Sequence, residues 1–186
     1  MNPGRIGIVS DTHGDAVAWR RVMEYLGPVD LVVHAGDVLY HGPRNPLPPG
    51  YDPGQLISLL SELNCPLIVA QGNCDAAVDA FVLQIPMQSP VVFLQHEGIR
   101  LLAHHGHQYT PDQLLSLAGR WGAHLCVTGH THLAGLERRN GIILLNPGSP
   151  SLPQGSPARP TAARLLDRRV ELVDVSNGEV LAVEQL

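Results

Sequence analysis

The chain has 186 residues, of which 16% are charged, and its formal net charge is -5 at pH 7. This length suits one domain with a substantial hydrophobic core, so we expect residues 1–186 to fold as a single domain. The acidic balance argues against charge-driven binding to duplex nucleic acid or to an anionic membrane. No stretch approaches the ~20 consecutive apolar residues of a membrane span, and the cysteines form neither a CxxC pair nor a disulfide framework, so we expect a cytoplasmic protein.

Three short runs of mostly β-branched residues open the chain, at residues 6–9, 31–33 and 67–69. Polar residues follow each run, as is typical of buried parallel strands. Residues 15–27 and 52–64 have the apolar spacing of amphipathic helices, and the second segment has a proline near its start. The first part of the chain is therefore predicted to fold as β-α-β-α-β.

The middle of the chain combines a predicted hairpin, a helix and a strand. Residues 90–106 hold two apolar runs separated by Glu97-Gly98, which favours a turn between two strands. Residues 111–122 have helical spacing, and residues 125–129 form another apolar run that ends at a glycine. The predicted helix thus leads directly into a strand.

Two turn signals in the last third of the chain predict hairpins. Asn140-Gly141 lies within the stretch 133–149, and Asn177-Gly178 lies within 162–186. This part of the chain is therefore predicted to form an antiparallel meander. A parallel half followed by a strand-rich half predicts an α/β fold, in which two sheets pack face to face as a sandwich with helices outside.

Side chains of the types that bind metal ions follow the predicted strands. They are Asp11 and His13, Asp37, Asn73, Cys74 and Asp75, His104, His105 and His107, and His130 and His132. Because the carboxyl ends of strands face the ligand crevice in open α/β sheets, these groups can converge there. A DxH triplet or a GD pair alone is more commonly a helix cap or a turn, so each motif needs the others. The ordered set as a whole is too large for one metal ion.

The ordered motifs DTH, GD, GNCD, HHGH and GHTH resemble those of the calcineurin-like metallophosphoesterase superfamily. Three longer stretches, GDVLYHGPRNPLPPGYDP, GNCDAAVD and NPGSPSLPQG, resemble the small bacterial phosphodiesterases of the YfcE type. The likeness runs from about Ile6 into the C-terminal strands. It implies a four-layer αββα sandwich, and a metal-dependent phosphoric diester hydrolase that cleaves small phosphodiesters by attack of a metal-bound hydroxide.

The resemblance also implies a set of ligands shared between two divalent ions: Asp11, His13 and His132 for one ion, Asn73, His105 and His130 for the other, and Asp37 bridging both. Oxygen and imidazole donors without a thiolate suit Mn²⁺, Fe or Zn²⁺. The resemblance makes Mn²⁺ the first expectation, with Ni and Mg as further alternatives. Two dications bound by two carboxylates keep a residual charge of about two, which favours one hydroxide and one phosphodiester anion.

Cys74 stands where the wider superfamily has a histidine that is thought to protonate the leaving group. A thiol has a pKa of about 8.5 and is a weak hydrogen-bond donor, so Cys74 is predicted to be a poor general acid and Asp75 to be structural. The alternative is that Cys74 packs beneath the metals, and that His107 or a metal-bound water supplies the proton. The candidate catalytic residues are therefore Asp37, Cys74 and His107, although a phosphate contact or the support of a ligand is equally open for His107.

Residues 39–54 hold five prolines and no regular apolar spacing, which predicts a long loop. Because the loop directly follows the GD motif, we expect it to wall the active site. His41, Asn45 and Tyr51 are the candidates to contact the ester substituent, and Asn73 is a further candidate for substrate binding. A subunit contact or a plain surface loop is the alternative, and a homo-oligomer is left open.

Two neighbours of the motifs are expected to be structural. His104 alternates with His105 and is predicted to point into the sheet or toward a carbonyl group. Gly129 is predicted to let the backbone approach a neighbour closely.

A different class of function is a protein-binding scaffold with a degraded metal site, which would resemble the retromer subunit of the superfamily. A phosphomonoesterase and a nuclease are further alternatives within the enzymes. Every motif position that supplies a ligand carries a competent residue here, which favours an enzyme over a scaffold. The absence of basic patches argues against a nuclease.

Overall fold

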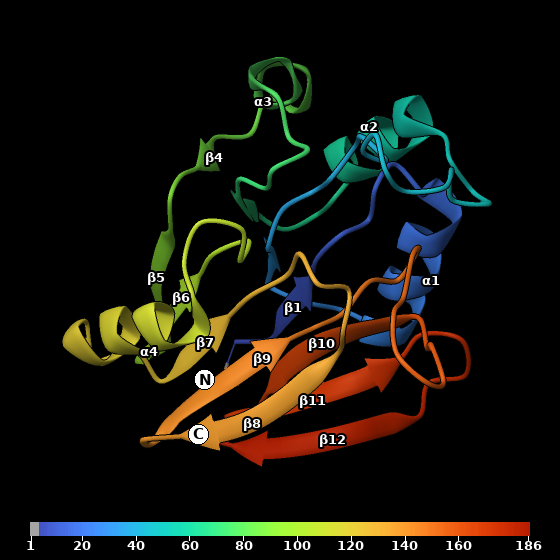
Figure 1. Ribbon diagram of the computed structural model, residues 1–186. Helices are drawn as coiled ribbons and strands as arrows, with labels where there is room; N and C mark the ends of the chain where they lie inside the picture. The colour runs from blue at the N-terminus through green and yellow to red at the C-terminus, as the bar shows by residue number, and fades with distance from the viewer. Residues whose placement is uncertain (1–3) are drawn as a thin grey trace.

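Figure 1 shows the computed structural model of the protein, in which residues 4–186 form two β-sheets flanked by helices. The larger sheet contains β1 (Ile6–Val9), β2 (Leu31–His34), β3 (Leu67–Ala70), β4 (Met87–Gln88), β10 (Thr161–Leu166), β11 (Arg169–Asp174) and β12 (Val180–Gln185). Their order is β12-β11-β10-β1-β2-β3-β4. The strands β1, β2 and β3 pair in parallel, so the predicted β-α-β-α-β opening is confirmed.

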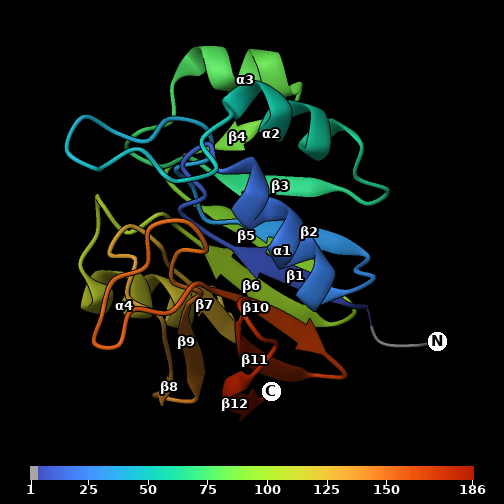
Figure 2. The same ribbon diagram turned by 90° about the vertical axis from the view of Figure 1, so that its right-hand side faces the viewer.

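The smaller sheet contains β5 (Val92–His96), β6 (Ile99–Ala103), β7 (Leu125–Val127), β8 (Gly135–Arg139) and β9 (Ile142–Asn146). Their order is β5-β6-β7-β9-β8. The predicted hairpin at Glu97-Gly98 is confirmed as the β5-β6 turn, where both residues have positive φ, 48° and 75°. The two sheets lie face to face in both views (Figure 1, Figure 2).

Helices cover the outer faces of both sheets. The helices α1 (Ala16–Leu26), α2 (Pro53–Ser61) and α3 (Ala77–Leu83) lie beside the larger sheet, and α4 (Pro111–Arg120) lies against the smaller one (Figure 2). This four-layer arrangement confirms the predicted α/β sandwich. Among residues 4–186, none of the helices has the length and apolar character that a membrane crossing requires.

The main core lies between the two sheets. Ile8 and Val33 from the larger sheet share one fully buried cluster with Leu101, Leu125 and Ile143 from the smaller sheet. Burial of apolar surface contributes about 25 cal/mol for each Å² removed from water, so this shared cluster holds the sheets together. The ends of the strands, and therefore the loops that follow them, are fixed relative to one another.

The three predicted helices form, with ends a few residues inside the predicted segments. The Asp15 side chain accepts a hydrogen bond from the Ala18 amide at 2.8 Å and begins α1, and Gly27 ends it with a φ of 66°. Asp52 caps α2 in the same way, with Pro53 in the first turn. Such caps satisfy amide groups that have no partner within the helix.

The sequence analysis did not predict α3 or β4. The helix α3 has only seven residues, and its apolar residues Val78 and Phe81 are 60% and 82% exposed. Its pattern therefore lacks the one-sided apolar stripe that identifies a surface helix. The strand β4 has two residues, which is too short for a period to be visible.

The prediction of one antiparallel meander is wrong. Strands β8 and β9 form the hairpin expected at Asn140-Gly141, but β9 pairs in parallel with β7. The chain then crosses to the larger sheet, where β10 pairs antiparallel with β1. Turn residues determine only the local hairpins, whereas burial of both faces in the core selects the more distant partner strand.

Candidate metal centre

The predicted metal-binding residues gather where the strands of both sheets end. Asp11 and His13 follow β1, Asp37 follows β2, Asn73 follows β3, His105 follows β6, and His130 and His132 follow β7. Five of these seven residues have positive φ, between 46° and 70°: Asp11, His13, Asp37, His130 and His132. Residues other than glycine seldom adopt this backbone conformation, which costs about 1–3 kcal/mol at each residue. Such strain is typical of functional sites, because the surrounding structure must hold it in place.

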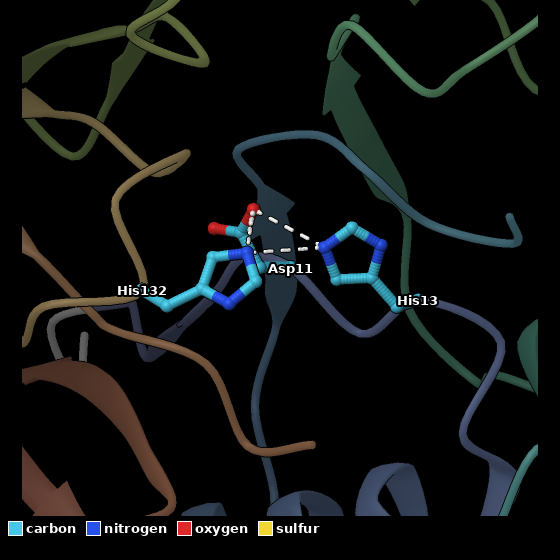
Figure 3. A group of neighbouring side chains, drawn as sticks. All are labelled: Asp11, His13 and His132. Atoms are coloured by element: carbon cyan, nitrogen blue, oxygen red, sulfur yellow. Dashed lines mark hydrogen bonds and ion pairs between the residues drawn. The ribbon is translucent and has the colours of Figure 1, made fainter. Parts of the chain in front are cut away.

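The first group of ligand atoms belongs to Asp11, His13 and His132, whose side chains point toward one another (Figure 3). The His132 Nε2 atom lies 3.3 Å from Asp11 Oδ1, and the His13 Nε2 atom lies 3.8 Å from the same oxygen. The two Nε2 atoms are only 3.1 Å apart. All three residues are buried, so water is largely excluded from this group.

The tautomers of these histidines follow from their hydrogen bonds. The Nδ1 atom of His13 donates to the Tyr40 carbonyl oxygen at 2.8 Å, and that of His132 donates to Leu152 at 2.7 Å. A carbonyl oxygen can only accept, so each neutral ring presents its Nε2 lone pair to the other ring. Two lone pairs 3.1 Å apart repel unless a cation or a proton lies between them. This contact therefore fits a shared metal ion.

The second group belongs to Asp11, Asp37 and His105. The His105 Nε2 atom lies 3.3 Å from Asp37 Oδ2 and 3.1 Å from Asn73 Oδ1. Its Nδ1 atom donates to the Ala35 carbonyl oxygen at 2.8 Å, so Nε2 again presents a lone pair, here to two oxygen acceptors. A cation at this point would satisfy all three atoms.

The two carboxylates connect the two groups. Asp37 Oδ2 lies 3.8 Å from His13 Nε2 as well as 3.3 Å from His105 Nε2. Asp11 Oδ1 faces all three imidazoles and, although buried, has no hydrogen-bond partner among residues 4–186. A buried carboxylate oxygen without a partner is costly, and a divalent cation removes that cost. The donor set thus fits two neighbouring divalent ions.

The pKa values of Asp37 and His105 are shifted in opposite directions, because the carboxylate and the protonated imidazole attract each other. Burial alone would raise the pKa of Asp37. The hydrogen bond to His105 and the charge of His105 outweigh this effect, so the pKa lies well below its usual value. Burial lowers the pKa of His105, but the hydrogen bond to Asp37 and the charge of Asp11 outweigh it and raise the pKa to about 9. When no metal is bound, a proton on His105 therefore takes the place of the cation.

His130 lies at the open side of the group. Its backbone amide donates to Asp11 Oδ2 at 3.0 Å, and its ring centroid lies 5.1 Å from that of His105. It is not part of the three clusters whose ligand atoms lie within 4.8 Å of one another. The structure thus brings His130 beside His105, in the lining of the pocket.

Hydrogen bonds from backbone amides and a hydroxyl fix the loops that carry the aspartates. Asp75 accepts hydrogen bonds from the amides of Asp37, Val38 and Gly72 at 2.7–2.9 Å, which agrees with the structural role expected for it. The Ser149 hydroxyl donates to the Asp11 carbonyl oxygen at 2.7 Å. These contacts determine the course of the loops and thereby aim the ligand side chains.

Two glycines allow the loops to approach closely. A Cβ atom at Gly129 would collide with Ser10 Oγ, as predicted for a close approach at this position, and one at Gly72 would collide with Asp37 Oδ1. His104 was expected to point into the sheet or toward a carbonyl group; it is fully buried, and its Nδ1 atom accepts a hydrogen bond from the Gly106 amide at 2.7 Å. It faces this tight turn rather than a carbonyl group, since the turn directs an amide toward the ring.

A pocket of about 540 Å³ opens over the metal-binding side chains. Its lining includes Asp37, Asn73, Cys74, His130 and His132. A second cavity, of about 500 Å³, lies on the other side of the GHTH loop and is lined mainly by apolar residues and no aspartate. The first pocket is therefore the candidate active site, because only it contacts the carboxylate and imidazole cluster.

The two candidate general acids occupy different positions. The Cys74 thiol lines the pocket and accepts a hydrogen bond from Asn73 Nδ2 at 3.2 Å. Burial raises the pKa of Cys74 to about 12, with the charge of Asp37 adding to the effect. His107 is absent from the pocket lining, and its ring lies 5.3 Å from that of His105 and is stacked on His104. His107 thus lies beside the candidate ligands His105 and His130 but outside the pocket lining.

The proline-rich loop forms one wall of the pocket, as predicted. Asn45 lies in the lining, together with Tyr40 and Arg44, which the sequence analysis did not single out. His41 and Tyr51 lie outside it and pack edge to face with ring centroids 5.3 Å apart. This ring contact joins two parts of the loop, and the backbone of Tyr51 is bridged to that of Asp15.

Comparisons with known proteins agree with this geometry. Residues 5–167 match the calcineurin-like phosphoesterase superfamily domain. The chain is 36% identical over 182 residues to phosphodiesterase YfcE of Escherichia coli, which covers 97% of this chain and 96% of that protein. A probable metallophosphoesterase of Methanocaldococcus jannaschii is 30% identical over 156 residues, covering 80% of this chain and 69% of that protein.

Solved structures show the same fold. The structure of E. coli YfcE superimposes with a TM-score of 0.86 at 32% identity, and covers 97% of this chain and 98% of that chain. Vacuolar protein sorting 29 from Cryptosporidium parvum superimposes with a TM-score of 0.71 at 19% identity, covering 100% and 99%, and this likeness concerns the fold alone. The motifs, the carboxylate and imidazole cluster and these matches together show that the chain belongs to the calcineurin-like phosphoesterase superfamily.

Proposed function

We propose that the protein is a binuclear metal-dependent phosphodiesterase that hydrolyses small phosphodiesters. The observation that carries the proposal is the 3.1 Å contact between His13 Nε2 and His132 Nε2, because both rings use Nδ1 as a donor elsewhere. The two Nε2 lone pairs and Asp11 Oδ1 together form a group of three acceptors that suits a cation. The 36% identity to a protein named as a phosphodiesterase supports the reaction class.

The proposed ligand set divides between two ions as follows: Asp11, His13 and His132 hold the first, Asn73, His105 and His130 hold the second, and Asp37 is shared. The position of Asp37 Oδ2 near both His13 and His105 supports its bridging role. Oxygen and nitrogen donors favour Mn²⁺, Fe or Zn²⁺, and we take Mn²⁺ as the first candidate, with Ni and Mg as alternatives. Cys74 also lies near His13 and Asp37, but its sulfur would be a softer donor than the oxygen and nitrogen atoms of the other candidate ligands.

Two divalent ions in such a site activate water for attack on phosphorus and neutralise charge on the phosphoryl group. The protein residues orient this chemistry. Backbone carbonyls fix the tautomers of His13, His105 and His132. Asn73 turns its Oδ1 toward His105 and its Nδ2 toward the pocket, where it is also available to a phosphoryl oxygen.

Proton donation to the leaving group is expected to be weak. Cys74 lines the pocket, and burial raises the pKa of its thiol to about 12, which makes it a poorer acid than imidazole. Substrates with good leaving groups, such as aryl diesters, should therefore be preferred over alkyl monoesters. The complete donor set also disfavours a scaffold that lacks catalysis, because a scaffold has no need of it.

The test combines metal analysis with a substrate screen. Protein stripped with a chelator and reloaded with Mn²⁺ should hydrolyse bis(4-nitrophenyl) phosphate faster than 4-nitrophenyl phosphate, and lose activity when stripped again. The variant His132→Ala should lose metal and turnover, whereas the exposed Arg21→Gln serves as a control. Equal hydrolysis by stripped and loaded protein would exclude the proposed mechanism.

A further inference from the structure

The wall of the pocket formed by residues 39–54 carries an arginine whose charge is not neutralised by the protein. Arg44 is exposed and lines the pocket of about 540 Å³, and no hydrogen bond or ion pair of its side chain occurs within residues 4–186. The chain has 12 arginines and no lysine. Among the arginines of residues 4–186, Arg44 alone belongs to this lining. The pocket lining thus includes one guanidinium group without a partner in the described part of the chain.

The acidic residues of the same pocket are already engaged with other groups. Asp75 uses both carboxylate oxygens to accept backbone amides, including those of Asp37 and Val38. Asp37 accepts the Cys74 amide through Oδ1, and its Oδ2 faces the imidazoles. Neither carboxylate forms an ion pair with Arg44, so the guanidinium remains available to an anion from outside the protein.

The loop that carries Arg44 is fixed close to the metal-binding residues. At one end, the Tyr40 carbonyl oxygen accepts the Nδ1 proton of His13 at 2.8 Å. At the other end, the Gly50 amide donates to Asp15 Oδ2 at 3.3 Å. Within the loop, Asn45 Nδ2 donates to the His41 carbonyl oxygen at 2.9 Å.

Prolines 43, 46, 48 and 49 flank Arg44 and further restrict the backbone. A cation on a fixed loop loses less conformational entropy when it binds a ligand than one on a flexible loop. The Arg44 backbone is therefore placed in advance, and only its side chain must be ordered by an anion.

The size of the pocket and the distribution of charge determine which anion Arg44 can meet. Pockets of about 300–1,000 Å³ accommodate a small organic ligand, so this one has room for a substituent beyond the phosphoryl group. The buried cluster of Asp11, Asp37 and three histidines already provides the site for the reacting phosphoryl group. Arg44 is exposed and lines the same pocket from the loop of residues 39–54, so it is available to a substituent of the diester.

We propose that Arg44 is a specificity residue that binds a second anionic group, a carboxylate or a phosphate, on the substituent of the phosphodiester substrate. The guanidinium fork can form two parallel hydrogen bonds with either group. The inference rests on the proposed phosphodiesterase function and narrows its substrate class to diesters that carry an additional negative charge.

The test uses three substrates with the same 4-nitrophenolate leaving group. They are 4-nitrophenyl 2-carboxyethyl phosphate, 4-nitrophenyl 2-phosphonooxyethyl phosphate and 4-nitrophenyl 2-carbamoylethyl phosphate. In the last compound an amide replaces the carboxylate at nearly constant shape, so the substituent is neutral while the diester itself remains an anion. The first two are called the charged compounds and the last the neutral one. The wild-type enzyme should prefer the charged compounds by roughly tenfold in kcat/KM, mainly through KM, because a charge-assisted hydrogen bond has about this effect. Arg44→Gln should reduce the preference to about one, and Arg44→Lys should retain part of it, since an ammonium lacks the fork.

The variant Arg21→Gln is the matched control, because it removes the same charge from an exposed position on α1. It should keep the wild-type preference, which distinguishes a local contact from the effect of net charge. An equal loss for charged and neutral substrates in Arg44→Gln would overturn the proposal and assign the arginine to the reacting phosphoryl group.

Failure of the phosphodiesterase function is distinguishable from failure of this inference. If metal-loaded protein hydrolyses none of the three compounds, they remain intact, and their affinities are measured by calorimetry. A roughly tenfold tighter binding of the charged compounds that Arg44→Gln abolishes would uphold the inference alone. Equal affinities of charged and neutral compounds for the wild type would overturn it.

Discussion

His13, His105 and His132 direct their Nε2 atoms toward the two carboxylates, because a backbone carbonyl group accepts the Nδ1 proton of each ring. The carbonyl groups belong to Tyr40, Ala35 and Leu152, which are distant in the sequence. The fold therefore prepares the lone pairs before any ion binds. This preparation accounts for the close contacts between acceptor atoms in the cluster.

The pH dependence of stability should reveal this arrangement. The pKa of His105 is raised from 6.5 to about 9, so its protonated form stabilises the fold below about pH 6.5, and that contribution is lost as the pH rises through about 9. Its upper bound is about 3 kcal/mol. The Tm of metal-free protein should fall from pH 6.5 to 9, whereas Mn²⁺ takes the place of the proton and limits the fall in loaded protein.

The measurement is a set of thermal unfolding curves across this pH range, with and without Mn²⁺. His105→Gln should flatten the curve of the metal-free protein. His96→Gln is the control, because His96 lies at the end of the β5-β6 hairpin opposite the site. Parallel pH curves for metal-free wild type and His105→Gln would contradict the account.

Cys74 gives a prediction about leaving groups. Its thiol has a pKa of about 12 and lines the pocket, so it should contribute little to proton donation. Cys74→His should reduce the dependence of kcat on leaving-group pKa, because general acid catalysis is worth about 10²–10⁴ in rate and matters most for basic leaving groups. Cys74→Ala should change the dependence little. Rates across a series of aryl and alkyl diesters measure it, and identical slopes in all three proteins would show that another group supplies the proton.

The sequence indicated most of the site residues, because each of them follows an apolar strand in a short motif. It did not indicate Arg44 or Tyr40, which lie in a loop without periodicity, and whose place in the pocket depends on contacts with His13 and Asp15. His41 and Tyr51 were expected in the pocket but support the loop from outside its lining. The direction of a loop side chain depends on tertiary contacts that a linear pattern does not contain.

At the level of elements, the loop of residues 39–54 should affect selectivity more than metal binding. Replacement of residues 41–49 by a Gly-Ser linker keeps Tyr40, the acceptor for His13, and keeps Tyr51, which is bridged to Asp15. The variant should bind Mn²⁺ nearly as the wild type does, because the residues of the metal-binding clusters lie outside the replaced segment. The ranking of diester substrates should change.

Kinetics over a panel of diesters and titration with Mn²⁺ measure the two effects separately. An unchanged ranking would leave a surface or subunit-contact role for the loop. A large loss of Mn²⁺ affinity would show instead that the loop is needed to position His13.

The helices were predictable because their apolar spacing and caps are visible locally, such as Asp15 for α1. The parallel strands were predictable because each is a short apolar run followed by polar residues. The partners of β9 and β10 were not predictable in the same way. The turn signal at Asn140-Gly141 joins β8 to β9, yet β9 also pairs with β7, and β10 pairs with β1 in the other sheet. Pairing between distant strands is decided by burial across the whole core, and a hairpin signal reaches only its own two strands.

Across the whole molecule, the packing of two sheets creates the site. The larger sheet supplies Asp11, His13, Asp37 and Asn73 at its strand ends, and the smaller sheet supplies His105, His130 and His132. The shared core of Ile8, Leu101 and their neighbours fixes the distance between the two sets. The single domain, the cytoplasmic location and the oligomeric state remain predictions.

The central claim is that this junction holds two divalent ions with Asp37 between them. Elemental analysis of Mn²⁺-loaded, buffer-exchanged protein, together with turnover of bis(4-nitrophenyl) phosphate and circular dichroism on the same samples, tests it most directly. We expect about two ions per chain in the wild type. Asp37→Asn should bind fewer ions and lose nearly all turnover, with an unchanged dichroism spectrum, because the residue lies in a loop beyond β2. Full turnover in Asp37→Asn, or full wild-type turnover with no more than one ion per chain, would contradict the account.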